Sequence, residues 1–184
     1  MNEKEKMIKG LMYNPEELNL KTDRTNVKIL CCKYNTMSYD KTDERKDLLK
    51  SILGKYSTNF TIEPNFFCDY GYNISIGENF YSNHNLVILD PAPVTFGDNV
   101  FIGPNCGFYT AMHPTNPDER NTYFEYAKPI TVGNNVWFGG NVTVLGGVTI
   151  GDNAVIGAGS VVVKDIPSNA IAVGNPCKPI KSVF

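Results

Sequence analysis

The chain contains only two histidines, so a reaction that needs a proton acceptor near neutral pH has few candidates. One of them, His113, lies in the polar, proline-bearing segment AMHPTNPDERNTYFEYAKP, and the proline that follows it favours an extended backbone. An imidazole with its ordinary pKa of ~6.5 can remove the proton of a hydroxyl group while that oxygen attacks a carbonyl carbon. The sequence therefore indicates a general base at His113.

Composition narrows the classes of function. A formal net charge of -2 and a pI near 5.7 give no basic surface of the kind that nucleic-acid binding needs. The five cysteines are scattered, without the spacing of a metal site or of a disulfide framework. No GxxxxGK[ST] loop is present, so a P-loop nucleotide site is unsupported.

A chain of 184 residues is long enough for one domain, with or without a small appendage. No stretch approaches the ~18 apolar residues of a membrane span. The N-terminal run MNEKEKMIKG is too charged for a signal peptide. We expect a cytoplasmic protein.

A six-residue frame organises the C-terminal third of the chain. This spacing matches neither the helical repeat nor a strand of period two, but it fits a solenoid whose inward side chains stack coil upon coil. Glycine follows the lead residue at positions 133, 139, 151 and 157, where we expect it to ease repeated bends. Two apolar series carry the frame: Val132, Phe138, Val144, Ile150, Ile156 and Val162, and, four positions later, Val136, Val142, Val148, Ala154, Ser160 and Ile166.

The same frame extends backward through Phe96, Ile102 and Phe108, and resumes at Val132 after 24 residues, a multiple of six. The polar segment in between is predicted to be a loop, about residues 112–130, extruded from one corner while the coil continues beneath it. A slip of two residues around the Asp-Pro-Ala-Pro run at 90–93 marks a second irregular corner.

The N-terminal part of the chain is charged and helix-like. Asp40 and Thr42 are candidate N-caps of its second helix, and Gly54 is a candidate stop. We predict a helical segment at 1–55, a β-helix at 56–170 and a C-terminal tail at 171–184. Two apolar stripes indicate the helices: Met7, Ile8, Leu11 and Met12, and Leu48, Leu49, Ile52 and Leu53.

Several motifs together resemble the maltose and galactoside O-acetyltransferases of the hexapeptide-repeat acyltransferase superfamily. They are IGENFYSNHN, the IGPN turn, the loop opening with His113-Pro114, and ITVGNNVWFGGNVTVLGGVTIGDNAVIGAGSVVVKDIP. The resemblance covers nearly the whole chain and implies a mainly β fold, a left-handed parallel β-helix that forms a homotrimer. It also implies acetyl transfer from acetyl-CoA, without a metal, to a hydroxyl of a sugar such as maltose, glucose or a galactoside, at sites between subunits. In the N-terminal segment the matching residues are Met7, Gly10, Tyr13, Leu18, Arg24, Tyr34 and Asn35.

The resemblance assigns roles in an acceptor site. His113 would be the catalytic base, and the amide of Asn83 would orient the acceptor hydroxyl or donate to developing charge. Asp69 would bind paired sugar hydroxyls, and Glu125 would hydrogen-bond either His113 or the acceptor. Further acceptor contacts are expected at Arg24 and Tyr81. His84 falls where the family tolerates other residues, so we expect it to be a surface or subunit contact.

Coenzyme A needs an apolar trough, backbone groups for its amides and cations for its phosphates. The single tryptophan, Trp137, is expected to be a wall of that trough, with a trimer-interface anchor as the alternative. Gly140 and Ala158 match positions whose backbone approaches the cofactor. The phosphates would be met by Lys164, Lys178 and Lys181.

Three alternatives remain at this level. The same scaffold can acetylate an antibiotic, an amino sugar or serine. A carbonic anhydrase of the γ class shares the coil but needs three histidines around zinc, and this chain has two. A β-helix that only binds or supports other molecules would have no need for His113, Asn83 and the lysines together.

Overall fold

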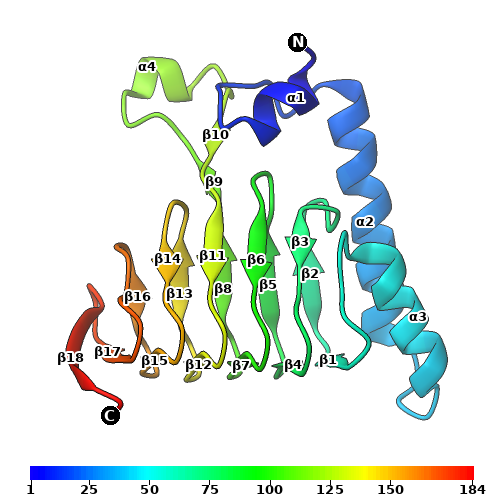
Figure 1. The fold of residues 1–184 in the computed structure, drawn as a ribbon. Helices are drawn as coiled ribbons and strands as arrows, with labels where there is room; N and C mark the ends of the chain where they lie inside the picture. Colours follow the sequence, from blue (N-terminus) through cyan, green and yellow to red (C-terminus); the bar gives the residue numbers. More distant parts are fainter.

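The computed structural model describes residues 1–184 and shows a mainly β chain, a left-handed parallel β-helix with helices packed at its N-terminal end (Figure 1). The expected fold class is confirmed. None of the helices is long and apolar enough to cross a membrane. The helices are α1 (Glu3–Ile8), α2 (Leu18–Thr36), α3 (Thr42–Ile52) and the short α4 (Pro117–Arg120).

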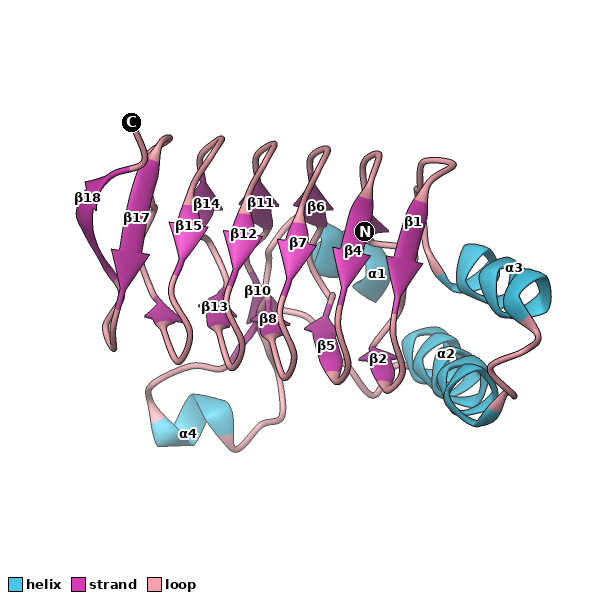
Figure 2. Ribbon diagram, turned by 90° about the horizontal axis from the view of Figure 1, so that it is seen from below, coloured by secondary structure: helices cyan, strands magenta, loops and turns pink.

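Each coil contributes one short strand to each of three parallel sheets, and Figure 2 shows the coils stacked along one axis. The seven-stranded sheet contains β1 (Phe60–Ile62), β4 (Phe80–Ser82), β7 (Phe101–Ile102), β12 (Trp137–Phe138), β15 (Val155–Ile156), β17 (Ala170–Val173) and the antiparallel β18 (Lys178–Ser182). The five-stranded sheet contains β2 (Phe66–Cys68), β5 (Leu86–Leu89), β8 (Gly107–Tyr109), β13 (Thr143–Leu145) and β16 (Val161–Val162). The four-stranded sheet contains β3 (Ile74–Ser75), β6 (Val94–Phe96), β11 (Ile130–Val132) and β14 (Thr149–Ile150).

The two inward series form the core, as the six-residue frame predicts. Every member of both is buried. Ser160, the one polar member, donates to the carbonyl of Gly157 at 2.6 Å and accepts from the amide of Gly174 at 3.1 Å. Aromatic rings add edge-on contacts along the axis, with centroids 4.9 Å apart for Phe96 and Phe108 and 5.3 Å apart for Phe108 and Phe138.

The glycines of the frame are required for a different reason from the one expected. Their φ angles are not positive, and the left-handed residues of the corners are mostly asparagines, such as Asn135 and Asn153. The glycines lie where successive coils approach closely: a Cβ on Gly139 would be 2.6 Å from the amide nitrogen of Ala158. The asparagine amides bond to one another between coils, Asn135 to Asn153 at 3.0 Å.

The N-terminal helices differ in detail from the predicted stripes. Helix α1 ends at Ile8, and Gly10, with φ of 69°, turns the chain away. Of the first stripe only Met7 is buried, in a small cluster with Tyr13, Leu20 and Tyr70. That stripe is therefore wrong as a helix face, because the helix is too short to present it.

Helix α3 also begins differently from the prediction. Its N-cap is Lys41, which makes no side-chain capping bond, whereas Asp40 accepts a hydrogen bond from Ser38. The helix does end before Gly54, where a Cβ would lie 2.0 Å from the carbonyl oxygen of Tyr72. Close packing against the first coil, and not a left-handed turn, explains that glycine.

The two departures from the frame are stacked at the same corner. The extruded loop is present: β9 (Ala111–Met112) pairs antiparallel with β10 (Tyr126–Ala127), and α4 lies in the segment between them (Figure 1). Thr110, at the base of this loop, donates its hydroxyl to the carbonyl of Leu89 at 2.8 Å and accepts from the amide of Ala92 at 3.0 Å. The loop is thereby tied to the slipped corner in the preceding coil.

Asp90 is the buried carboxyl of the slipped corner. Its Oδ1 accepts hydrogen bonds from the amides of Asp69 at 3.0 Å and Tyr70 at 2.8 Å, while its Oδ2 is buried without a partner. Burial raises the pKa of Asp90 to about 7, against the lowering effect of the amide bond from Tyr70. The folded protein thus holds this carboxyl largely protonated in mildly acidic solution.

This environment makes stability depend on pH with a definite sign. Since the folded pKa lies above the unfolded one, Asp90 destabilises the fold increasingly as pH rises from about 4 to 7. Asp90→Asn keeps an oxygen acceptor without the charge. The free energy of unfolding of this variant, relative to the parent, should improve by roughly 1 to 4 kcal/mol across that interval in urea titrations.

Asp98→Asn is the matched control, since the carboxylate of Asp98 is exposed and likewise accepts a backbone amide hydrogen bond, from Glu78 at 2.7 Å. A difference between Asp90→Asn and the parent that stays constant from pH 4 to 8 would contradict the assignment.

Candidate active site

The extruded loop brings His113 and Glu125 together. The pairing of Met112 with Tyr126 places both at the base of the loop, with His113 Nε2 3.8 Å from Glu125 Oε2. The imidazole is half exposed, and the carboxylate is mostly covered. The arrangement suits a base whose protonated form faces a carboxylate.

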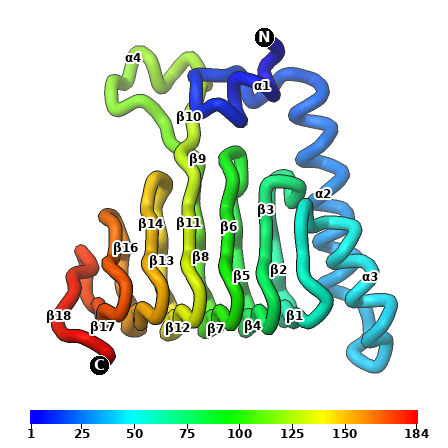
Figure 3. Tube along the Cα trace, viewed as in Figure 1, coloured from blue at the N-terminus to red at the C-terminus, as the bar shows by residue number.

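Tyr13 fixes that carboxylate. Its hydroxyl donates to Glu125 Oε1, and the two residues also exchange backbone hydrogen bonds, Tyr13 N to Glu125 O at 3.0 Å and Glu125 N to Tyr13 O at 3.2 Å. Burial, together with the bond to Glu125, raises the pKa of the Tyr13 phenol, so it stays a donor. The N-terminal segment is thus joined to the loop, as Figure 3 shows for the chain path.

Asp69 and Arg24 lie on the same side of the molecule. Arg24 Nη1 donates to the hydroxyl of Tyr70 at 2.7 Å, and its Nη2 lies 3.2 Å from Glu16. Burial raises the pKa of Asp69, while the positive charges of Lys28 and Arg24 lower it. The guanidinium already has two partners within the chain, so part of its role is to hold Tyr70.

Asn83 and Trp137 line a hollow of about 590 Å³ on another part of the surface. Its other lining residues are Tyr81, Phe101, Ile102 and Gly103. The Oδ1 of Asn83 accepts the amide of His84 at 2.7 Å, which leaves its Nδ2 to donate elsewhere. His84 itself is exposed at that corner, where its Nδ1 contacts the carbonyl of Pro64.

Strand register sets the other wall of this hollow. Tyr81, Phe101 and Trp137 pair in sequence across β4, β7 and β12, and the row continues through Val155 and Ile171. Lys181 of β18 pairs with Ile171 at the end of that row. Trp137 is 57% exposed, as an outward ring would be. The row therefore runs from the aromatic groove, lined by Tyr81, Phe101 and Trp137, through two aliphatic residues to a lysine.

The other residues expected to bind coenzyme A lie near the C-terminal coils. Gly140 and Ala158 occupy equivalent corners of consecutive coils, and the carbonyl of Gly140 accepts the amide of Gly159 at 2.9 Å. The expected phosphate contacts Lys164, Lys178 and Lys181 are all exposed.

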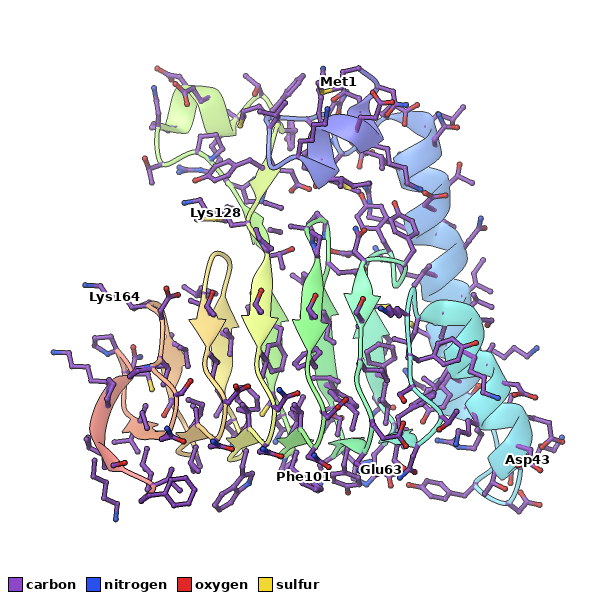
Figure 4. The ribbon with its side chains drawn as sticks, in the orientation of Figure 1. Met1, Asp43, Glu63, Phe101, Lys128 and Lys164 are labelled. Atoms are coloured by element: carbon purple, nitrogen blue, oxygen red, sulfur yellow. The ribbon has the colours of Figure 1, made fainter.

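The residues around His113 and those around Trp137 are not adjacent within one chain. In Figure 4 Phe101 marks the sheet that holds Asn83 and Trp137, while Lys128 marks the base of the extruded loop on the opposite side. Figure 1 shows β4, β7 and β12 away from β9 and β10. Asn83 lies at the corner between β4 and β5, whereas His113 lies in the loop after β8 and β9, so a single copy presents them at different corners of the coil. No group of three or more histidine, cysteine, aspartate or glutamate side chains is arranged to hold a metal ion.

Three neighbours of the site were not anticipated as functional. Phe101 lies 36 residues before Trp137 yet pairs directly with it, because 18 of these residues are additional ones in the extruded loop, so the repeat identifies Phe101 only once that loop is set aside. Tyr13 and Tyr70 carry no such periodic signal, because their positions depend on how the helices pack against the coil.

Family models and known structures agree with the observed fold. Residues 6–57 match the maltose acetyltransferase hexapeptide capping motif, 129–164 match the bacterial transferase hexapeptide with six repeats, and 93–110 match the hexapeptide repeat of succinyl-transferase. A protein of Saccharomyces cerevisiae, provisionally named an acetyltransferase, is 51% identical over 93% of this chain and 86% of its own length.

Two solved structures are similar throughout. A maltose O-acetyltransferase from Clostridium difficile 630 superposes with a TM-score of 0.98 at 46% identity, over 99% of this chain and 97% of the other. A galactoside acetyltransferase in complex with coenzyme A gives a TM-score of 0.97 at 41% identity, over 100% and 92% of the two chains.

Proposed function

This chain belongs to the hexapeptide-repeat acetyltransferases with a maltose acetyltransferase capping motif, and from that membership we propose that it transfers the acetyl group of acetyl-CoA to a sugar hydroxyl. Maltose, glucose and galactosides are the acceptors to test first. The observation that carries the proposal is the pair of His113 and Glu125, with the carboxylate held by buried Tyr13. The coenzyme A bound to the galactoside acetyltransferase supports the donor.

The proposed reaction is a direct transfer. His113 takes the proton of the acceptor hydroxyl as its oxygen bonds to the thioester carbon. The carbon–sulfur bond then breaks, and the imidazolium returns the proton to the departing sulfur, so coenzyme A leaves as a thiol. The negative charge of Glu125 stabilises the imidazolium formed on the way. The Nδ2 of Asn83 donates to the hydroxyl oxygen or to the charge that develops on the carbonyl oxygen.

The acceptor and the donor use different parts of the fold. In the proposal Asp69 and Glu125 bind sugar hydroxyls, with Arg24 and Tyr81 at the edges of the acceptor site. Trp137 covers the pantetheine arm of the donor, and the backbone at Gly140 and Ala158 meets its amides. The nucleotide phosphates lie against Lys164, Lys178 and Lys181.

The site is completed by a second copy of the chain. Because His113 and Asn83 lie at different corners of the coil in one copy, we propose a homotrimer in which the loop of one subunit meets the aromatic groove of its neighbour. A cyclic arrangement of this kind forms the same site three times.

Removing the base tests the chemistry. His113→Ala should lower kcat for acetyl transfer to maltose or a galactoside by about 100-fold, the usual value of general-base catalysis, with little change in affinity for acetyl-CoA. Release of the coenzyme A thiol, with and without acceptor, is the measurement. His84→Ala is the control and should lose far less. A His113→Ala enzyme with near-normal kcat would remove this residue from the mechanism.

Mixing two inactive variants tests the shared site. His113→Ala and Asn83→Ala chains, unfolded together and refolded at equal concentration, should regain up to about a quarter of parental activity, because some interfaces combine an intact histidine with an intact asparagine. Each variant refolded alone should stay inactive. Sedimentation of the parent should give a trimer. No recovery in mixed trimers would place the complete site within one chain.

Removing the lysine charges tests the donor side. The triple variant Lys164→Ala, Lys178→Ala and Lys181→Ala should raise KM for acetyl-CoA and leave KM for the sugar nearly unchanged, with a loss of about 1 kcal/mol or less per exposed charge. Acetyl-pantetheine, which lacks the nucleotide, is the matched donor. Equal losses with both donors would assign the lysines to the fold or the trimer.

A further inference from the structure

One backbone position breaks a rule that the rest of the chain obeys. Nine residues other than glycine have a positive φ, and eight of them are asparagines at corners of the β-helix. The ninth is Tyr123, with φ of 65°. Asparagine tolerates the left-handed region, whereas an aromatic side chain does so only at a cost in free energy.

The position of Tyr123 usually belongs to glycine. Helix α4 ends at Arg120 with Asn121 as its C-cap, and the amide of Tyr123 donates to the carbonyl of Arg120 at 3.1 Å. Tyr123 lies one residue beyond the C′ position that a left-handed cap normally occupies, and glycine takes a positive φ there without strain. The backbone conformation at this position therefore favours glycine or asparagine over tyrosine.

Packing does not explain the tyrosine either. Its side chain is 77% exposed and belongs to neither hydrophobic cluster. Its hydroxyl makes no hydrogen bond within the chain, and its ring makes no aromatic contact there. Strained residues that the fold does not require are concentrated at functional sites.

The ring lies at the proposed active site. Tyr123 lines a hollow of about 310 Å³ with His113, Arg120 and Asn121. The Nη1 of Arg120 donates to the carbonyls of Pro114 at 3.3 Å and Thr115 at 3.2 Å, which holds this side chain within the loop. An aromatic surface therefore stands beside the proposed base, in a loop held by hydrogen bonds.

We propose that Tyr123 determines specificity by stacking on the pyranose ring of the acceptor at His113. This rests on the proposed acetyl transfer to sugars. A tyrosine ring offers a rigid, largely apolar face at a low cost in conformational entropy, and the C–H face of a pyranose is its apolar side. The acceptor class is thus a ring sugar, in preference to serine or another small alcohol that has no such face.

Two substitutions separate the ring from the strain. Tyr123→Gly and Tyr123→Asn both remove the ring and both suit a positive φ, so Tm should rise by about 1 to 3 °C. In the same proteins KM for maltose or a galactoside should rise about 5-fold or more, while KM for acetyl-CoA stays within 2-fold. Tyr123→Phe keeps the ring and should keep KM for the sugar within about 2-fold.

Sugar binding without acetyl-CoA gives a readout apart from turnover. Calorimetric titration of maltose into the parent and the variants should show about the same 5-fold loss. Unchanged sugar KM and Kd in Tyr123→Gly and Tyr123→Asn would overturn the proposal. So would a lower Tm with dissociation of the trimer, which would make the ring a subunit contact. Sugar binding without acetyl transfer by the parent would contradict the proposed function and leave the stacking proposal standing.

Discussion

The close stacking of coils is the constraint on which the rest of the structure depends. Parallel strands of consecutive coils pair residue by residue, so Trp137 stands on Phe101 and Val155 stands on Trp137. At the corners the backbones approach so closely that Gly139 has no room for a Cβ beside Ala158. The asparagine amides then bridge the coils with hydrogen bonds. Each outward residue therefore has a place fixed by its position in the repeat.

This constraint explains which parts of the fold the sequence could predict. A repeat of six determines which residues point inward, and both apolar series are buried. The repeat does not determine which residue turns a corner, because glycine and asparagine can both do so. The pattern therefore predicted bends at the glycines, whereas the left-handed corner residues are mostly asparagines. The sequence pattern did not predict helix α2, from Leu18 to Thr36, as a separate element. Its buried residues are a sparse stripe among polar ones: Leu20, Val27, Cys31 and Tyr34.

The candidate site, like the fold, could be predicted from the sequence only in part. Trp137, a residue of the periodic rows, keeps the outward position that the frame gives it, whereas Lys181 lies in the antiparallel β18, beyond the reach of the frame. The pair of His113 and Glu125 could be named from the family resemblance, but its geometry depends on Tyr13, which reaches it from more than a hundred residues away. Periodicity carries no information on such a contact. The separation of His113 from Asn83 also follows only from the folded chain.

The irregular corner holds part of the proposed active site. The slip at Asp90 and the loop after Thr110 occupy the same corner of consecutive coils and are joined through the Thr110 hydroxyl. Asp90 in turn holds the amides of Asp69 and Tyr70, so the buried carboxyl supports the residues proposed to meet the sugar. A regular corner has no room for an unpaired carboxyl or a strained tyrosine, because every position must fit against the next coil. A corner that leaves the frame is free of that demand, and His113, Glu125 and Asp69 lie at or beside it. Asn83 and Tyr81 instead line the hollow beside Trp137, on the sheet that repeats regularly through β4, β7 and β12.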